Sequence, residues 1–204
     1  MSSSIDAGAP AGSPTLTSAR SIKCHNDVLA ATQELLAEGG LQAATIDAIA
    51  ERSTVSKATI YKHWPSRIAV AAEAFGIAVG DALPIPDTGN IVDDLTEHVR
   101  NVSMFYATPR GRVFTQLLAA CVDDEAGADY FQRYYLDGRR ALTATLWERA
   151  VERGEVHPGT DIQVVSDVMF GPMALRLITG SAPFDAAQAE EFARVVLHGL
   201  LSVP

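Results

Sequence analysis

Two short helical segments joined by a turn of only three residues constrain the fold of this chain more than any other feature. Residues 45–52 and 56–63 have helical patterns, and Thr45 and Ser56 stand where a side-chain oxygen caps a first helical turn. An inward-facing aliphatic set is spaced to hold the segments at a fixed angle: Ile46, Ile49, Val55 and Ile60. A pair of this kind fits a helix-turn-helix.

The second of these segments is too polar for an ordinary core helix. In the stretch STVSKATIYKHW, residues 53–64, Val55 and Ile60 are the plainly apolar aliphatic side chains. Taken alone, the stretch also fits a surface helix with solvated charges. In a helix-turn-helix, such a helix enters the major groove of DNA, where lysines neutralise phosphates and hydroxyls reach base edges, and helix N-termini attract phosphate. The candidate DNA-binding residues are Thr45, Ser56, Lys57, Thr59, Tyr61, Lys62 and His63.

The charge of the chain is unevenly distributed. Its formal net charge is −9, so we do not expect the whole molecule to bind nucleic acid non-specifically. Residues 15–68 carry six Lys or Arg and five Asp or Glu, whereas residues 69–204 carry ten Arg and nineteen Asp or Glu. One region can therefore face a polyanion while the rest is repelled by it.

Apolar residues recur at helical spacing along the chain, and no stretch has a convincing strand pattern. We expect an all-α protein with a flexible tail over residues 1–18, an N-terminal domain over 19–82 and a second domain over 83–204. The connection is the Pro-, Gly- and Asp-rich segment 83–90. The first helix stops at Gly39-Gly40, a further helix runs from Ser66 to about Gly80, and later helices are expected near 91–107, 110–122, 128–153, 161–179 and 185–202.

The cysteines and the N-terminal residues argue for a cytoplasmic protein without a metal or cofactor. Cys24 and Cys121 lie far apart, which fits reduced thiols better than a disulfide framework, and Cys24-His25 has no second ligand pair at zinc spacing. Residues 1–18 lack the basic start and apolar core of a signal peptide. No stretch has enough consecutive apolar residues for a membrane span, so we expect no membrane partner.

The stretch from Val28 to Arg67 closely resembles the DNA-binding domain of the TetR family of bacterial transcription regulators, and the resemblance extends from about Arg20 to Phe75. Its most specific parts are Glu-Leu-Leu-x-Glu-x-Gly, Thr-Ile-x-x-Ile-Ala and Val-Ser-x-x-Thr-Ile-Tyr-x-x-Trp-Pro-Ser. The resemblance implies a regulator that binds DNA with the second helix of the pair.

The resemblance also implies roles for single residues. Thr45 and Tyr61 match phosphate-contacting positions, and Arg67 stands where the family usually has a Lys at the start of the fourth helix. Two residues depart from the pattern, because Thr54 replaces the usual Gly of the turn and Ser53 replaces the usual Ala. A β-branched residue is costly where φ is positive, so we expect a slightly reshaped turn.

For the second domain, the resemblance implies a helical regulatory domain that dimerises and holds a small ligand. Aromatic and Met side chains on different helices fit the lining of an apolar cavity, although each also fits an ordinary core. The candidate pocket residues are Phe105, Phe114, Tyr134, Trp147, Met169 and Met173.

The last two expected helices carry many apolar residues for terminal helices. With the copies of a partner they would form a four-helix bundle, and the alternative is packing on earlier helices of the same chain. The candidate dimer-interface residues are Ile162, Val165, Leu175, Phe192, Val196 and Leu200.

These features favour a ligand-responsive repressor that binds a palindromic operator as a homodimer. Its partners would be double-stranded DNA and an unknown small-molecule effector. The alternative on the same fold is a ligand-blind DNA-binding or scaffold protein. An enzyme is not expected, because no nucleophile motif, metal spacing or phosphate loop accompanies His98, Cys121, His157 and His198.

Overall fold

The structure, a computed structural model, describes residues 19–80 and 85–201, with side chains up to residue 199. The expected tail over residues 1–18, the start of the connection at 83–90 and the side chain of Leu200 lie outside this description. All regular elements within the described residues are helical, which confirms the all-α prediction. None of these helices is both long and apolar enough to cross a lipid bilayer.

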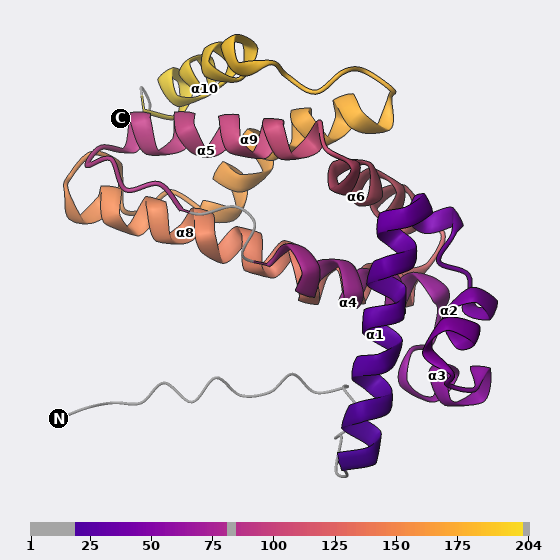
Figure 1. The fold of residues 1–204 in the computed structure, drawn as a ribbon. Coiled ribbons are helices and arrows are strands. Elements are labelled where there is room, and N and C mark those ends of the chain that lie inside the picture. Colours follow the sequence, from indigo (N-terminus) through magenta and orange to yellow (C-terminus); the bar gives the residue numbers. More distant parts are fainter. Residues whose placement is uncertain (1–18, 81–84, 202–204) are drawn as a thin grey trace, which may run out of the picture.

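The N-terminal helices form one end of the molecule (Figure 1). Their bounds are α1 Ala19–Gly39, the short 3₁₀ turn η1 Gly40–Gln42, α2 Ile46–Ser53, α3 Lys57–His63 and α4 Arg67–Val79. The expected caps are present, because Thr45, Ser56 and Ser66 each accept a hydrogen bond from the backbone N–H three residues later. Local sequence therefore sets where α2, α3 and α4 begin.

The remaining helices form the other end of the molecule, with α5 and α10 packed against each other (Figure 1). Their bounds are α5 Ile91–Tyr106, α6 Pro109–Ala120, α7 Glu125–Phe131, the π-helical turn η2 Gln132–Leu136, α8 Asp137–Glu152, α9 Ile162–Ile178 and α10 Ala186–Leu201. At the start of α10, Asp185 and Gln188 each accept a hydrogen bond from the backbone N–H of the other.

The expected helix over 128–153 differs from the observed one in two ways. It begins earlier, at Glu125, because the Asp124 carboxylate accepts a hydrogen bond from the Gly127 N–H at 2.7 Å and so caps α7. It is also interrupted by the wide turn η2, which separates α7 from α8.

Helix α4 connects the two ends of the molecule. It packs against α1 on the N-terminal side and against α7 and η2 on the other. Ala69, Val70 and Ala72 are fully buried along it. The lack of a side chain at Gly76 lets the α4 backbone approach η2, because a Cβ there would collide with the main chain of Tyr134. A movement of the C-terminal helices would therefore reach α3 through α4.

Candidate nucleic-acid interface and ligand cavity

The helix-turn-helix is held together by the aliphatic residues that its sequence predicts. Ile49 and Ile60 are completely buried, and Ile46 and Val55 are each 8% exposed. Trp64, directly after α3, is also buried. The opposite face of α3 is thereby fixed toward solvent.

The two cap hydroxyls lie at the starts of the helices of the motif. Thr45 accepts from the Ala48 N–H at 3.1 Å, and Ser56 accepts from the Thr59 N–H at 3.2 Å. The Ser56 and Thr59 hydroxyls also lie 2.9 Å apart. A hydroxyl that accepts such a bond still has a proton to donate, so Thr45 can cap α2 and donate to a phosphate at the same time.

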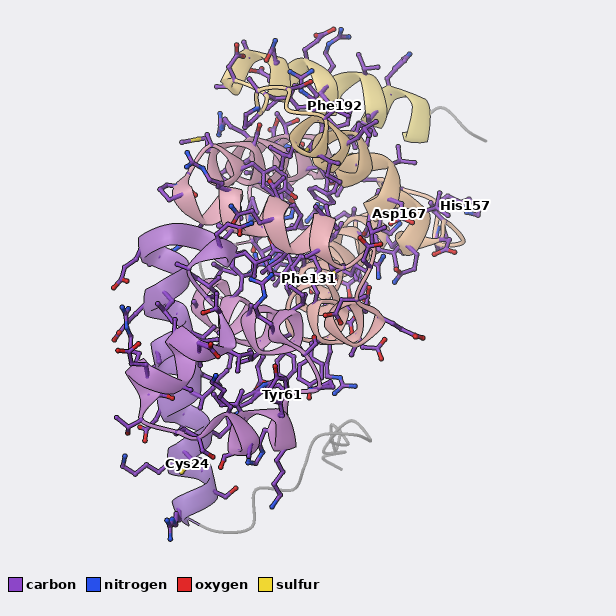
Figure 2. All side chains as sticks on the ribbon, turned by 90° about the vertical axis from the view of Figure 1, so that its right-hand side faces the viewer. Cys24, Tyr61, Phe131, His157, Asp167 and Phe192 are labelled. Carbon is purple, nitrogen blue, oxygen red and sulfur yellow. The ribbon has the colours of Figure 1, made fainter. Side chains whose placement is uncertain are left out.

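Lys57, Tyr61 and Lys62 lie on the exposed face of α3. Tyr61 is 54% exposed, and Figure 2 places it at the end of the molecule far from Phe192. Lys57 forms an ion pair with Asp47, Nζ to Oδ1 2.5 Å, in which both side chains are more than half exposed. Exposed pairs of this kind contribute little free energy, so Lys57 can exchange Asp47 for a phosphate at small cost.

His63 does not lie on the outward face, as the sequence led us to expect. It is three residues after Ile60 and therefore turns toward the same inner side of α3. Its ring lies 6.0 Å from that of His25 and 5.7 Å from that of Trp64. Partial burial, and then the neighbouring His25 and Lys62, lower the pKa of His63. Its backbone carbonyl accepts a hydrogen bond from the Tyr130 hydroxyl of α7 at 3.2 Å.

Arg67 is only half-exposed and is engaged by the turn that follows α1. Its Nη1 donates to the Leu41 carbonyl at 2.6 Å, while the Leu41 N–H donates to Oε1 of Gln116 on α6 at 2.8 Å. Arg67 thus holds the turn before α2, and the other N–H groups of its guanidinium can still donate to a phosphate. Gln116 was not identified from the sequence, because nothing in its local pattern indicates a contact 75 residues away.

Thr54 occupies the left-handed conformation that its position in the turn requires, with φ 57° and ψ 18°. It is the only non-glycine residue with positive φ among those described. Thr54 therefore carries the energetic cost that we expect for a β-branched residue at a position where the family usually has glycine.

Replacing Thr54 with glycine should stabilise the protein by about 1 kcal/mol, because glycine adopts this conformation without the Cβ penalty. Urea unfolding followed by circular dichroism measures the change. Thr160→Gly, in the loop between α8 and α9, is the matched control and should not stabilise. An unchanged or lower midpoint for Thr54→Gly would show that the turn carries no strain.

A cavity of about 160 Å³ lies between α5, α6, η2, α8 and α9. Of the six pocket candidates, Phe114 lines it, and Phe105 lines a separate, wider groove between α1, α4, α5 and α6. Trp147, Met169 and Met173 are buried in the core, and Tyr134 stacks on Tyr130, so none of these four lines the cavity. The lining side chains are His98, Val102, Tyr106, Phe114, Leu118, Tyr135, Leu136, Arg139, Arg140, Thr143, Ser166, Asp167, Phe170 and Ala174.

Polar atoms without a hydrogen-bond partner among the described residues occur in the cavity lining. They are His98 Nδ1, Arg139 Nη1 and Ser166 Oγ, and each atom is buried. Burial, with the Arg139 charge adding to it, lowers the pKa of His98 to about 4, so His98 is neutral at pH 7. Buried polar groups normally have partners, so the cavity is equipped for a polar molecule.

Comparison with known proteins supports the same architecture. Residues 28–74 match the family model of the bacterial regulatory proteins of the tetR family, and residues 85–196 match that of the tetracyclin repressor-like C-terminal domain. The chain belongs to the TetR family. It is a transcriptional regulator with an N-terminal helix-turn-helix and a helical C-terminal domain, as the sequence predicted.

Relatives of this TetR-family protein match most of its length. The uncharacterized HTH-type transcriptional regulator YdeS of Bacillus subtilis is 39% identical over 79% of this chain and 82% of its own. The DNA-binding transcriptional repressor TetR of Mycobacteroides abscessus is 29% identical over 78% of this chain and 84% of its own. The crystal structure of the TetR family regulator SCO0332 superposes with a TM-score of 0.74 at 35% identity, covering 89% of this chain and 100% of that one.

An exposed apolar stripe runs along α9 of this TetR-family protein. Val164, Val168, Leu175 and Ile178 are between 40% and 61% exposed, and their spacing places them along one side of the helix. Val195 on α10 is exposed as well.

The candidate interface residues do not all lie on the surface of the protomer. Leu175 lies on the exposed stripe, whereas Ile162, Phe192 and Val196 are half-buried. Val165 is completely buried within its own protomer and cannot belong to an exposed interface. One helical residue turns the side chain by about 100°, so neighbouring candidates on one helix lie on different faces of it.

Proposed function

We propose that the protein is a ligand-responsive repressor that binds operator DNA as a homodimer. The main observation behind this proposal concerns α4. This helix directly follows the helix-turn-helix, and its C-terminal end is hydrogen-bonded to Arg139, a residue that lines the cavity. An exposed α3 supports DNA binding, and a cavity with unpaired polar atoms supports an effector. Operators are read in the cytoplasm, where we place the protein.

The proposed DNA contacts come from both helices of the motif. Lys57, Thr59, Tyr61 and Lys62 on α3 reach base edges and phosphates, and the N-termini at Thr45 and Ser56 receive phosphates. Arg67 contributes through the guanidinium N–H groups that do not bind Leu41. His63 has a supporting role instead, since its ring lies in the aromatic cluster with His25 and Trp64.

Replacing Lys62 with alanine should weaken operator binding about tenfold, because a phosphate or base contact is lost. The slope of log K against log salt should also fall by about 1. The probe is a duplex selected by the wild-type protein from a random-sequence pool, and fluorescence anisotropy gives the affinity. Arg100→Ala, which removes an exposed cation on α5 outside the proposed DNA and dimer contacts, is the matched control. Unchanged affinity in both Lys57→Ala and Lys62→Ala would contradict the assignment of α3.

The proposed dimer pairs α9 and α10 with the copies of a second protomer. Two half-sites on one face of a duplex require recognition helices about 34–36 Å apart, so the separation must be set by such a bundle. An exposed aliphatic stripe on α9 provides the apolar surface that this contact needs.

Leu175→Glu should convert the dimer into a monomer, because it places a carboxylate in the middle of the stripe. Sedimentation velocity reads out the mass. Val122→Glu is the matched control, since Val122 is 83% exposed just after α6 and is not part of the α9 stripe. A Leu175→Glu protein that still sediments as a dimer would place the interface elsewhere.

Thermodynamic linkage between effector binding and operator binding distinguishes the ligand-responsive repressor from the ligand-blind alternative. If an effector weakens operator binding, the operator must weaken effector binding by the same factor. Effector titrations with and without operator DNA therefore decide between them, and equal effector affinities would favour the ligand-blind protein.

A further inference from the structure

The cavity combines aromatic walls with a guanidinium group in which one nitrogen, Nη1, has no hydrogen-bond partner among the described residues, and this combination indicates its ligand. We propose that it binds a single-ring aromatic carboxylate and that Arg139 both receives the carboxylate and transmits its binding to α4. This inference rests on the proposed ligand-responsive function and specifies the effector.

The size and walls of the cavity fit one ring. Its volume is about 160 Å³, and an engineered cavity of about 150 Å³ in another protein binds benzene. Tyr106, Phe114, Tyr135 and Phe170 contribute aromatic side chains to the lining. The Tyr106 and Phe114 rings are stacked with their centroids 4.9 Å apart, so they form one continuous aromatic surface.

The charges in the lining favour an anion. Arg139 Nη1 is buried and has no hydrogen-bond partner among the described residues, while the guanidinium carbon lies 5.8 Å from the centroid of the Tyr135 ring. The other two charged side chains of the lining, Arg140 and Asp167, lie 3.6 Å apart and compensate each other. A carboxylate is the group that matches a guanidinium fork in both charge and shape.

Two further groups can position the bound molecule. His98 is 2% exposed and Ser166 is 5% exposed, and each has a buried polar atom without a described partner. They lie on α5 and α9, whereas Arg139 lies on α8, so three helices converge on the cavity. A carboxylate held by Arg139 therefore has hydrogen-bonding groups from two other helices within the same lining.

Arg139 also holds the C-terminal end of α4. Its Nη2 donates to the carbonyl oxygens of Val79, at 3.1 Å, and of Gly80. A cation at this position caps carbonyls that lack an intrahelical partner and complements the helix dipole. The guanidinium of this cavity-lining residue thus has one buried nitrogen without a hydrogen-bond partner among the described residues, and one nitrogen bound to the helix that follows the DNA-binding motif.

A bidentate carboxylate would use both of these nitrogens. It competes with Val79 and Gly80 for Nη2 and weakens the cap on α4. Because α4 begins just after α3, a displacement of the C-terminal end of α4 changes the positions of the two recognition helices in the dimer. Ligand binding is thereby coupled to release of the operator.

The first test compares acids with their neutral isosteres on the full-length protein. Benzoate and phenylacetate are titrated by calorimetry beside benzamide and phenylacetamide. We expect each acid to bind the wild-type protein at least tenfold more tightly than its amide, and each acid to raise the operator Kd at least fivefold. Amides that bind as well as the acids, or acids that do not bind at 10 mM, would overturn the proposal.

The second test assigns the effect to Arg139. Arg139→Gln should abolish the preference for acids and leave operator binding insensitive to them, whereas Arg140→Gln should retain both. Arg139→Lys keeps the charge but not the forked geometry of the guanidinium, so it should keep part of the preference for acids. It also tests the assignment if the glutamine variant does not fold. Retention of the full preference in either Arg139 variant would overturn the assignment. If a neutral compound releases the operator and the acids do not, the repressor function stands and this inference falls.

Discussion

Replacing Gly76 with alanine is expected to destabilise the protein by about 3 kcal/mol, the upper end of what overpacking costs. The added Cβ would lie 2.7 Å from the carbonyl carbon of Tyr134 and closer still to its oxygen. Both are backbone atoms of η2, so no side chain can rotate away. The result would be a displacement of α4 from η2, and therefore a loss of operator affinity beyond the loss of stability.

Gly138→Ala is the matched control for this prediction. Gly138 lies in α8, and a Cβ there would meet no atom within 4 Å. Alanine should stabilise the helix by about 1 kcal/mol, so the same chemical change has opposite signs at the two positions. Urea unfolding measures both. A Gly76→Ala protein as stable as the wild type would show that α4 and η2 are not in close contact in solution.

Helix starts were the part of the fold that local sequence could predict. Thr45, Ser56 and Asp161 each accept a backbone N–H where the sequence places a cap. The positive φ of Thr54 was also foreseeable, because it concerns one residue and its own backbone. Such features depend on neighbours within about one helical turn.

Features that depend on how helices cross were less predictable. The cavity lining combines Tyr106, Phe114, Arg139 and Phe170 from α5, α6, α8 and α9, and their convergence is set by tertiary packing. Met169 belongs to the core while its neighbour Phe170 lines the cavity, although their sequence patterns are alike. Hydrophobic character alone does not distinguish the wall of a cavity from the filling of a core.

Removing the Glu73 carboxyl is expected to cost about 3–5 kcal/mol, because Glu73→Ala leaves buried polar partners unsatisfied and opens a cavity. Glu73 on α4 is 4% exposed. Its Oε2 accepts from the Trp64 indole N–H at 2.6 Å, and its Oε1 lies 2.9 Å from Nε2 of His25. The His25 and Trp64 rings are stacked with centroids 4.6 Å apart. One side chain therefore ties α1 and the end of α3 to α4.

Glu73→Gln and Glu148→Ala separate the contributions to this effect. The glutamine keeps the volume and one acceptor oxygen for Trp64, so its loss should be about 1–2 kcal/mol. Glu148 is an exposed glutamate on α8, and its replacement should change stability by no more than about 0.5 kcal/mol. Urea unfolding ranks the three variants, and operator titration at temperatures where each is folded shows the effect on DNA binding. Because Trp64 directly follows α3, Glu73→Ala should bind the operator more weakly even when fully folded. Wild-type affinity in the folded variant would show that this network stabilises the domain without orienting α3.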